Sequence, residues 1–141
     1  MALDVATLTI DCHDPRALAR WWGSALDWKI TYETPPEESD NDLEVAIGPK
    51  SGAVWDFLFI QVPDEKVVKN RLHLDLRPED QQAEVDRLLA MGAKKVNVGQ
   101  GDDVTWVVMA DPEGNEFCIL RALTPEEQEE KEKEAKDSQG S

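Results

Sequence analysis

The sequence has few cysteines, no long apolar run and no secretion signal. Two cysteines in 141 residues are too few for a disulfide framework, and a chain of this length buries roughly 68% of its unfolded surface without such cross-links. No stretch approaches the roughly 18 apolar residues of a membrane span, and the segment Met1 to Asp14 lacks the basic start and apolar stretch of a signal peptide. We therefore expect a one-domain, cytoplasmic protein with no membrane partner.

Basic residues are also scarce, 15 against 30 acidic ones, which gives a formal net charge of −15. Nucleic-acid binding depends on clustered lysines and arginines that release counterions, so we expect no nucleic-acid partner. The acidic charge either keeps the surface soluble or attracts a cationic ligand. The sequence contains no phosphate loop, GxGxxG fingerprint, paired CxxC motif or nucleophile elbow, so nucleotide cofactors and Ser-His-Asp hydrolysis are not indicated.

The first half of the chain predicts the order strand, helix, strand, strand, strand. Residues 5–11 alternate between apolar and polar side chains and are rich in β-branched residues, as in a half-buried strand. A helix begins after Asp14, because aspartate suits the capping position and Pro15 suits the first turn. Strand-forming composition then recurs in three segments, residues 28–34, 43–47 and 54–62.

The second half repeats this order. Residues 71–77 alternate between leucines and polar side chains, and residues 78–91 have the spacing of an amphipathic helix. Three further strands are predicted at residues 95–98, 104–109 and 115–120. The two halves, about residues 3–63 and 70–122, are offset by about 65 residues. We therefore predict an α+β domain over residues 1–123, built from two βαβββ modules.

Each module would bury one sheet face under its helix and turn the other face toward a shared, sheet-lined cavity. In this interpretation the leucines and isoleucines of the strands lie under the helices, and the polar or aromatic residues line the cavity. Those wall residues are Thr7, Thr9, Asp11, Phe57, Phe59, Gln61, His73, Asp75, Glu116 and Cys118. Trp106 is a further wall candidate, because aromatic rings suit planar or apolar ligands.

The acidic segment 124–141 lies outside the repeat. It contains good helix formers but almost no apolar stripe. We expect it to be a frayed helix or disordered.

Three segments carry a resemblance to a known family. They are His13-Asp14-Pro15 with the following Leu18, Trp21, Trp22, Leu26 and Trp28, the strand Arg71-Leu72-His73-Leu74-Asp75-Leu76, and the turn Asp111-Pro112-Glu113-Gly114-Asn115-Glu116-Phe117. Over about residues 3–122 the chain resembles the vicinal oxygen chelate superfamily. More narrowly it resembles the glyoxalase-like group, with glyoxalase I, extradiol dioxygenases and bleomycin-resistance proteins among its members. The resemblance implies the paired βαβββ fold and a homodimer. It does not fix the chemistry, because members include isomerases, dioxygenases, epimerases, lyases and non-catalytic binders.

The resemblance also implies four positions for a divalent metal, on the first and last strand of each module. They fall on Thr7, Phe59, His73 and Cys118. Only His73 matches the His, Gln or Glu of metal-binding members, and threonine and phenylalanine are not ordinary ligands of divalent ions. A shift of two residues would bring in Gln61, and Glu116 would be a substitute for Cys118, but either set is weak. We expect no bound metal and no other cofactor.

His73 is the candidate for chemistry. Histidine exchanges a proton near neutral pH, so His73 would be a general acid or base or a donor to a ligand carbonyl; alternatively it is a hydrogen-bonded wall residue. Asp75 lies two residues along on the same face and would orient His73, although residues so spaced are about 7 Å apart on a strand. Cys118 is a soft metal ligand, a nucleophile or an inert buried side chain.

Two functions follow from these residues and the resemblance. The first is a lyase or isomerase acting on a small carbonyl compound, with His73 as acid or base and Thr9, Gln61 and Asp75 positioning the substrate. The alternative is a non-catalytic, ligand-sequestering protein of the bleomycin-resistance type. Both bind a small organic molecule, and the sequence leaves open whether the protein is an enzyme.

Overall fold

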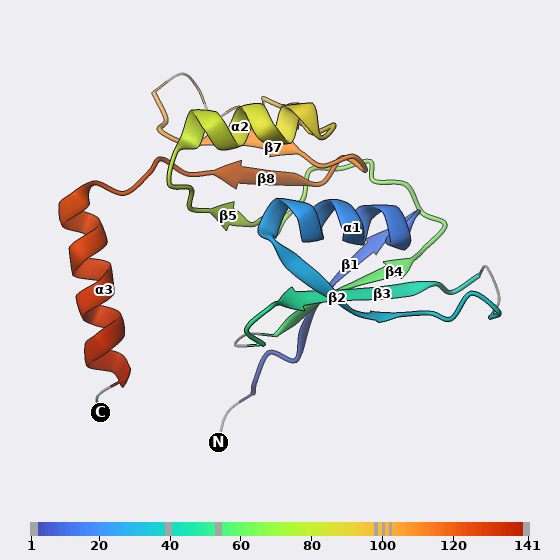
Figure 1. Cartoon of the computed structure of the whole chain (residues 1–141). Coiled ribbons are helices and arrows are strands. Elements are labelled where there is room, and N and C mark those ends of the chain that lie inside the picture. The colour runs from blue at the N-terminus through green and yellow to red at the C-terminus, as the bar shows by residue number, and fades with distance from the viewer. Residues whose placement is uncertain are drawn as a thin grey trace. The chain divides into compact units, whose positions relative to one another are not determined.

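The computed structural model describes residues 3–38, 41–52, 55–97, 99, 101 and 103–139 (Figure 1). The chain divides into two compact units. The first contains residues 1–68 and 112–114, and the second contains residues 69–111 and 115–141. Each unit has its own four-stranded sheet.

The first unit contains one helix and four strands. In chain order they are β1 (Thr7–Cys12), α1 (Pro15–Leu26), β2 (Trp28–Glu33), β3 (Glu44–Pro49) and β4 (Asp56–Gln61). The strands lie in the order β1-β4-β3-β2, with β1 parallel to β4 and the other pairs antiparallel. Residue 54, predicted as the first of its strand, lies outside the described residues.

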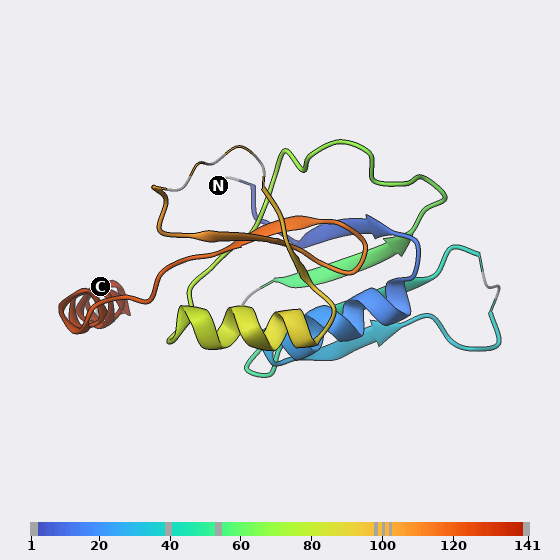
Figure 2. The same cartoon turned by 90° about the horizontal axis from the view of Figure 1, so that it is seen from above.

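An aspartate caps each end of helix α1, Asp14 at its start and Asp27 at its end. The side chain of Asp14 accepts the N–H of Ala17 at 3.1 Å, and Pro15 follows in the first turn. The helix ends at Asp27, whose φ of 56° is left-handed. Its buried stripe includes Leu18 and Trp22, and the helix lies along the sheet in two views (Figures 1 and 2). The sequence prediction of this helix and its cap is confirmed.

The core of the first unit lies between α1 and the inner face of the sheet. Val45 pairs with Phe59, and Ile47 pairs with Phe57, so these four side chains share a face. The Cγ2 atom of Ile47 lies 4.0 Å from the position that a Cβ on Gly23 would occupy, which places this face under the helix. Phe57 and Phe59 are only 5% and 0% exposed.

This burial corrects the predicted face of β4. Phe57 and Phe59 were expected on a cavity wall, and Leu58 and Ile60 under the helix. The structure reverses the assignment, leaving Leu58 and Ile60 half-buried on the opposite face. The predicted alternation of the two faces of β4 is correct, but the face predicted to point toward the helix is the wrong one. A phenylalanine ring removes more apolar surface from water than leucine or isoleucine does, so burying both rings is favoured.

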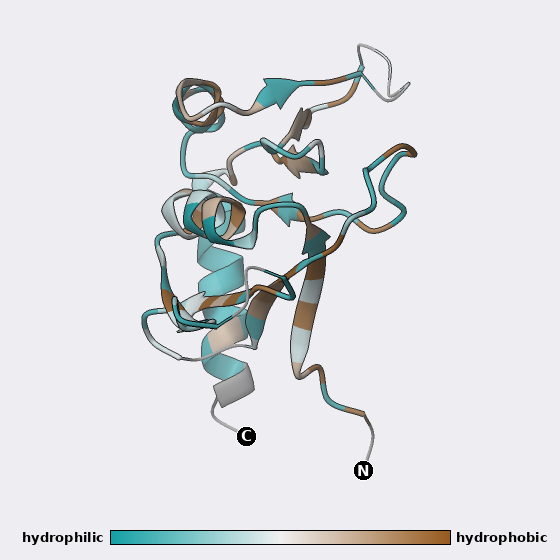
Figure 3. Ribbon diagram, turned by 90° about the vertical axis from the view of Figure 1, so that its right-hand side faces the viewer, coloured by the Kyte–Doolittle hydropathy of each residue, from teal (hydrophilic) through white to brown (hydrophobic). Residues whose placement is uncertain are grey.

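Strand β1 alternates visibly between apolar and polar residues (Figure 3). Leu8 and Ile10 pair with Phe57 and Phe59, so they lie on the core face. Thr7 and Thr9 lie on the other face and are exposed. The prediction that Thr7, Thr9, Phe57 and Phe59 share one wall is therefore corrected.

The second unit repeats the topology of the first. Its elements are β5 (Asp75–Leu76), α2 (Gln81–Ala90), β6 (Lys94–Lys95), β7 (Val107–Ala110) and β8 (Glu116–Ile119). The order β5-β8-β7-β6, with β5 parallel to β8, matches the first sheet strand for strand. The prediction of an α+β fold with two βαβββ modules is confirmed.

Strand β5 is shorter than predicted. The sequence indicated a strand over residues 71–77 with Leu72 under a helix, but β5 has two residues and Leu72 is 84% exposed. Helix α2 also begins later than predicted, because Asp80 caps it by accepting the N–H of Ala83 at 3.0 Å. Residue 98, the predicted end of a strand, lies outside the described residues.

The acidic segment forms helix α3 (Pro125–Gln139), which is mostly hydrophilic in Figure 3. Its start is a capping box. The N–H of Thr124 donates to Glu127 at 3.0 Å, and the N–H of Glu127 donates to the Thr124 hydroxyl at 3.2 Å. Arg121 also pairs with Glu127 at 2.8 Å, and these bonds lower the pKa of Glu127 to about 2. Over the described residues, no helix has the length and apolar character needed to cross a membrane.

Candidate functional site

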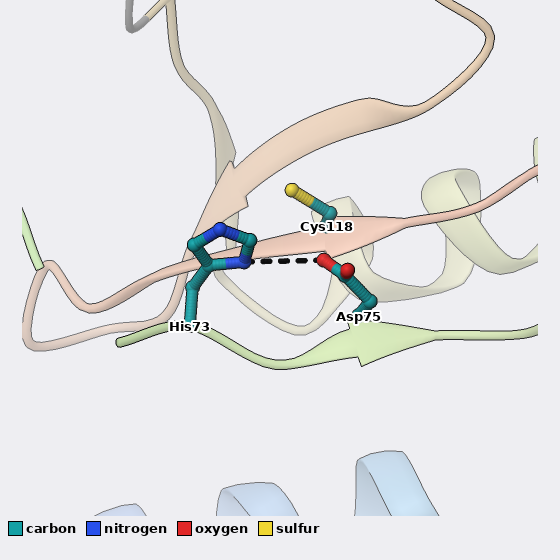
Figure 4. Close-up of side chains that lie close together, drawn as sticks. All are labelled: His73, Asp75 and Cys118. Carbon is teal, nitrogen blue, oxygen red and sulfur yellow. Dashed lines mark ion pairs between the residues drawn. The ribbon is translucent and has the colours of Figure 1, made fainter. Parts of the chain in front are cut away.

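The pairing of β5 with β8 brings three reactive side chains together. Asp75 is the register partner of Cys118 in this parallel pair, so both lie on one face of the sheet. His73 lies two residues before Asp75, in the irregular segment that leads into β5. Figure 4 shows the imidazole of His73 pointing toward the carboxylate of Asp75, with the Cys118 sulfur beside them.

The three side chains are in contact range. His73 Nδ1 lies 3.1 Å from Asp75 Oδ1 (Figure 4, dashed line). One donor atom from each of His73, Asp75 and Cys118 lies within 4.8 Å of the others. The side chains of His73 and Asp75 are 40% and 50% exposed, whereas Cys118 is buried. His73 and Asp75 therefore form the solvent-accessible side of the cluster, and Cys118 forms its buried side.

Burial raises the pKa of the Cys118 thiol, and the negative charge of Asp75 raises it further. The thiol also donates a hydrogen bond to Asp75, which favours its protonated form. The positive charge of Lys69 acts in the opposite direction but is the weakest of these effects. Cys118 is therefore a protonated thiol at neutral pH and not an activated nucleophile.

A pocket of about 300 Å³ opens over this cluster. All its lining residues belong to the second unit. They are Lys69, His73, Asp75, Trp106, Val108, Glu116, Phe117, Cys118 and Leu120. The volume is at the lower end of the range for ligand pockets, so the pocket fits a small molecule.

The pocket contains the predicted candidates His73, Asp75, Trp106, Glu116 and Cys118. Trp106 is 39% exposed and offers an aromatic surface. Glu116 also holds the chain before β5, because its carboxylate accepts the N–H of Asn70 at 3.0 Å. Sequence analysis missed four lining residues, Lys69, Val108, Phe117 and Leu120. Val108 pairs with Cys118 across the β7–β8 hairpin, so an assigned hairpin register would have found it.

The other candidates belong to the first unit. Thr7 and Thr9 lie on the outer face of its sheet, and Phe57 and Phe59 lie in its core. Gln61 holds two loops in place. Its Oε1 accepts the N–H of Leu43 at 3.3 Å, and its Nε2 donates to the carbonyl of His13 at 3.4 Å. The amide of Gln61 thus has a structural task.

The residues at the four family metal positions do not fit a divalent ion. Phe59 has no donor atom and is buried, and Thr7 has a hydroxyl, which is a poor ligand. The described residues contain a different group of three possible ligands within reach of one another, His73, Asp75 and Cys118. Only two of them, His73 and Cys118, stand at family positions.

Comparison with known proteins identifies the family. The model of the glyoxalase-like domain family matches residues 7–120. No curated protein matches the sequence. Among solved structures, the fosfomycin resistance protein FosX from Mesorhizobium loti is similar, with a TM-score of 0.65, 13% identity, and coverage of 89% of this chain and 97% of that chain.

Two further structures share the fold. A glyoxalase/bleomycin resistance protein/dioxygenase family enzyme from Burkholderia phytofirmans PsJN has a TM-score of 0.60 at 17% identity, covering 86% of this chain and 100% of that chain. TnmS3, an antibiotic-binding protein from Streptomyces sp. CB03234, has a TM-score of 0.57 at 18% identity, covering 87% of this chain and 99% of that chain. The family match spans both βαβββ modules, so this chain belongs to the glyoxalase-like domain family of the vicinal oxygen chelate superfamily.

Proposed function

We propose that this protein binds a small organic molecule in the pocket of the second unit and acts on a carbonyl group of that molecule as a lyase or isomerase. The observation that carries this proposal is the contact between His73 and Asp75 at 3.1 Å in a pocket of about 300 Å³. A pocket that places a histidine against a carboxylate has a proton carrier whose ring is held in one orientation.

Each lining residue has a distinct task in this proposal. His73 donates a hydrogen bond to the ligand carbonyl or exchanges a proton beside it. Asp75 is a positioning residue, since it accepts from Nδ1 and leaves Nε2 for the ligand. Trp106 provides an apolar wall for the carbon skeleton.

The charges of the pocket support a carbonyl compound more than a cationic drug. The carboxylate of Asp75 contacts His73, and that of Glu116 accepts a backbone N–H. Lys69 adds a positive charge to the same lining. An acidic groove for a cation, the sequestering alternative, is therefore less well supported by this pocket.

The test is a screen of small carbonyl compounds by ligand-observed NMR, run with chelator and again with added Zn²⁺. Hits are titrated against wild type, His73→Ala and Trp106→Ala. Trp55→Ala is the matched control, because Trp55 is also 39% exposed but belongs to the first unit. We expect binding to weaken in the two pocket variants and to persist in the control.

Turnover of the hits separates the two functions. Loss of general acid or base catalysis in His73→Ala should lower the rate by at least about 100-fold. Ligands that bind without turnover would favour the sequestering protein. Binding that is unchanged in both pocket variants would refute the proposed site.

The family resemblance also implies a homodimer, which we propose as the working assembly. Sedimentation equilibrium should then give twice the 15.8 kDa of one chain. A mass of 15.8 kDa at micromolar concentration would exclude it.

A further inference from the structure

We propose that Lys69 binds a carboxylate in the pocket, so that the ligand of this protein is a small carbonyl acid, a compound with a carbonyl group and a carboxylate in one molecule. The inference rests on the proposed function and names the chemical class of its ligand. Its basis is an ammonium group in the pocket lining that pairs with no carboxylate of the described residues, while both lining carboxylates contact other groups.

The chain beside Lys69 is attached to the sheet. The next residue, Asn70, donates its N–H to the carboxylate of Glu116 at 3.0 Å. Glu116 is the first residue of β8, the strand that also carries Cys118. This bond holds the backbone next to Lys69 at the start of β8. Lys69 therefore lines the pocket from an anchored segment, although the residue itself is exposed.

The ammonium group of Lys69 keeps donors available for a ligand. It carries three N–H bonds, and it donates one hydrogen bond, to the carbonyl of Asn70 at 3.3 Å. Within the described part of the chain it forms no ion pair with a carboxylate. Its positive charge acts at the buried side of the pocket, where it opposes the rise in the pKa of the Cys118 thiol. A cation in this position attracts an anionic group of a ligand.

The two carboxylates of the lining have donors of their own. The Asp75 carboxylate contacts the imidazole of His73 at 3.1 Å. The Glu116 carboxylate accepts a backbone N–H at 3.0 Å. Such contacts stabilise a carboxylate where it lies, so neither acid depends on Lys69 for a partner. A ligand carboxylate beside Lys69 would provide the ion pair that this lysine lacks.

The charges of the lining favour a carboxylate over a phosphate. A phosphate monoester carries about two negative charges at pH 7 and three strong acceptor oxygens, and arginines or a helix N-terminus commonly bind it. Among the described residues, the lining has one lysine, two acids and no arginine. Two acids repel a dianion more strongly than a singly charged group. One ammonium group matches the single charge of a carboxylate.

The test compares carbonyl acids with their methyl esters, which keep the carbonyl group and remove the charge. The full chain is titrated by calorimetry in chelator at pH 7 with short 2-oxo and 4-oxo acids and with their esters. We expect the better acid to bind about 5- to 30-fold more tightly than its ester, between the values for an exposed ion pair and for a charge-assisted hydrogen bond. Added salt should reduce this difference, because it screens exposed charges.

Three variants assign the preference to one side chain. Lys69→Met removes the charge at similar length, and it should lower the affinity for the acid to that for the ester while leaving the ester unchanged. Lys69→Arg retains the charge and should retain the preference. Lys95→Met is the matched control, because Lys95 is also an exposed lysine of the second unit but lies outside the lining. It changes the net charge equally and should bind the acid as wild type does.

Two results would overturn the inference and leave carbonyl binding intact. One is equal affinity of wild type for acid and ester. The other is an equal effect of Lys69→Met and Lys95→Met on binding of the acid.

Carboxylates without a carbonyl group, such as butanoate and benzoate, separate the inference from the proposed function. If they bind through Lys69 and an added carbonyl group contributes no affinity, the carboxylate site holds and the proposed function fails. If no carboxylate of either kind binds wild type at millimolar concentration, the carboxylate site is refuted.

Discussion

The carboxylate of Glu113 accepts the backbone N–H of His13 at 2.6 Å, across a hundred residues of sequence. Its second oxygen accepts the N–H of Asp14 at 3.0 Å. Both amides precede the first turn of α1, where backbone donors have no partner within the helix. Asp111 shapes the turn that carries Glu113, by accepting the N–H of Asn115 at 3.0 Å. The turn motif that carried the family resemblance is thus a structural brace for the first unit.

Replacing Glu113 with alanine is expected to destabilise the protein by about 1–2 kcal/mol, as the loss of a helix cap does. Urea unfolding measures the change. Glu113→Gln retains one acceptor oxygen and should lose about half as much. Equal stability of all three proteins would show that the brace contributes nothing.

Phe59→Ala is expected to lower the free energy of unfolding by about 3–5 kcal/mol, because Phe59 is 0% exposed and its removal leaves a cavity. Leu58→Ala, on the opposite face of β4, is the control and should cost less. If Phe59→Ala instead left stability unchanged and abolished ligand binding, Phe59 would be a pocket wall after all.

Asp75→Asn is expected to make Cys118 more reactive toward alkylating reagents. The charge of Asp75 helps to raise the pKa of the thiol above its ordinary value of 9.0, and the substitution removes that charge. Alkylation rates against pH, measured in a Cys12→Ser background, should show a midpoint above 9.0 that moves down in the variant. If the midpoint did not move, burial alone would account for the raised pKa of the Cys118 thiol.

The start of α3 is expected to lose helicity in acid. The pKa of Glu127 is lowered from 4.5 to about 2, so its contribution is complete above about 4.5 and is lost as the pH falls through about 2. Circular dichroism between these values should show a decrease that is absent from Glu127→Ala. Glu126→Ala, in the same turn, keeps the capping box and should behave as wild type.

The element order was readable from the sequence because its signals are local. Asp14 and Pro15 mark a helix start within two residues, and turn residues separate the strands. The phase of β4 was not readable, because both of its faces are apolar and alternation does not say which face points inward. The length of β5 depends on its pairing with β8, which local composition does not report.

The site was only partly readable for a related reason. His73 and Asp75 were recognised as neighbours on one face, but ideal strand spacing kept them about 7 Å apart. They touch because β5 begins at Asp75 and His73 lies before it, outside regular strand geometry. Cys118 joins them only through a register between segments 43 residues apart in sequence.

Strand β5, two residues long and at the edge of its sheet, positions the chain that holds His73 and Asp75. Two backbone hydrogen bonds attach this chain to β8. The N–H of Cys118 donates to the carbonyl of Leu74 at 2.9 Å, and the N–H of Leu120 donates to the carbonyl of Leu76 at 2.8 Å. A short edge strand detaches from its sheet more readily than a central strand does. A ligand that binds the pocket only while β5 is paired makes that detachment rarer. Hydrogen exchange at these two amides should therefore slow on binding, while that of Asp111, bonded to Asn115, stays constant. The lifetimes of two backbone protons thus measure the occupancy of the pocket before its ligand has been identified.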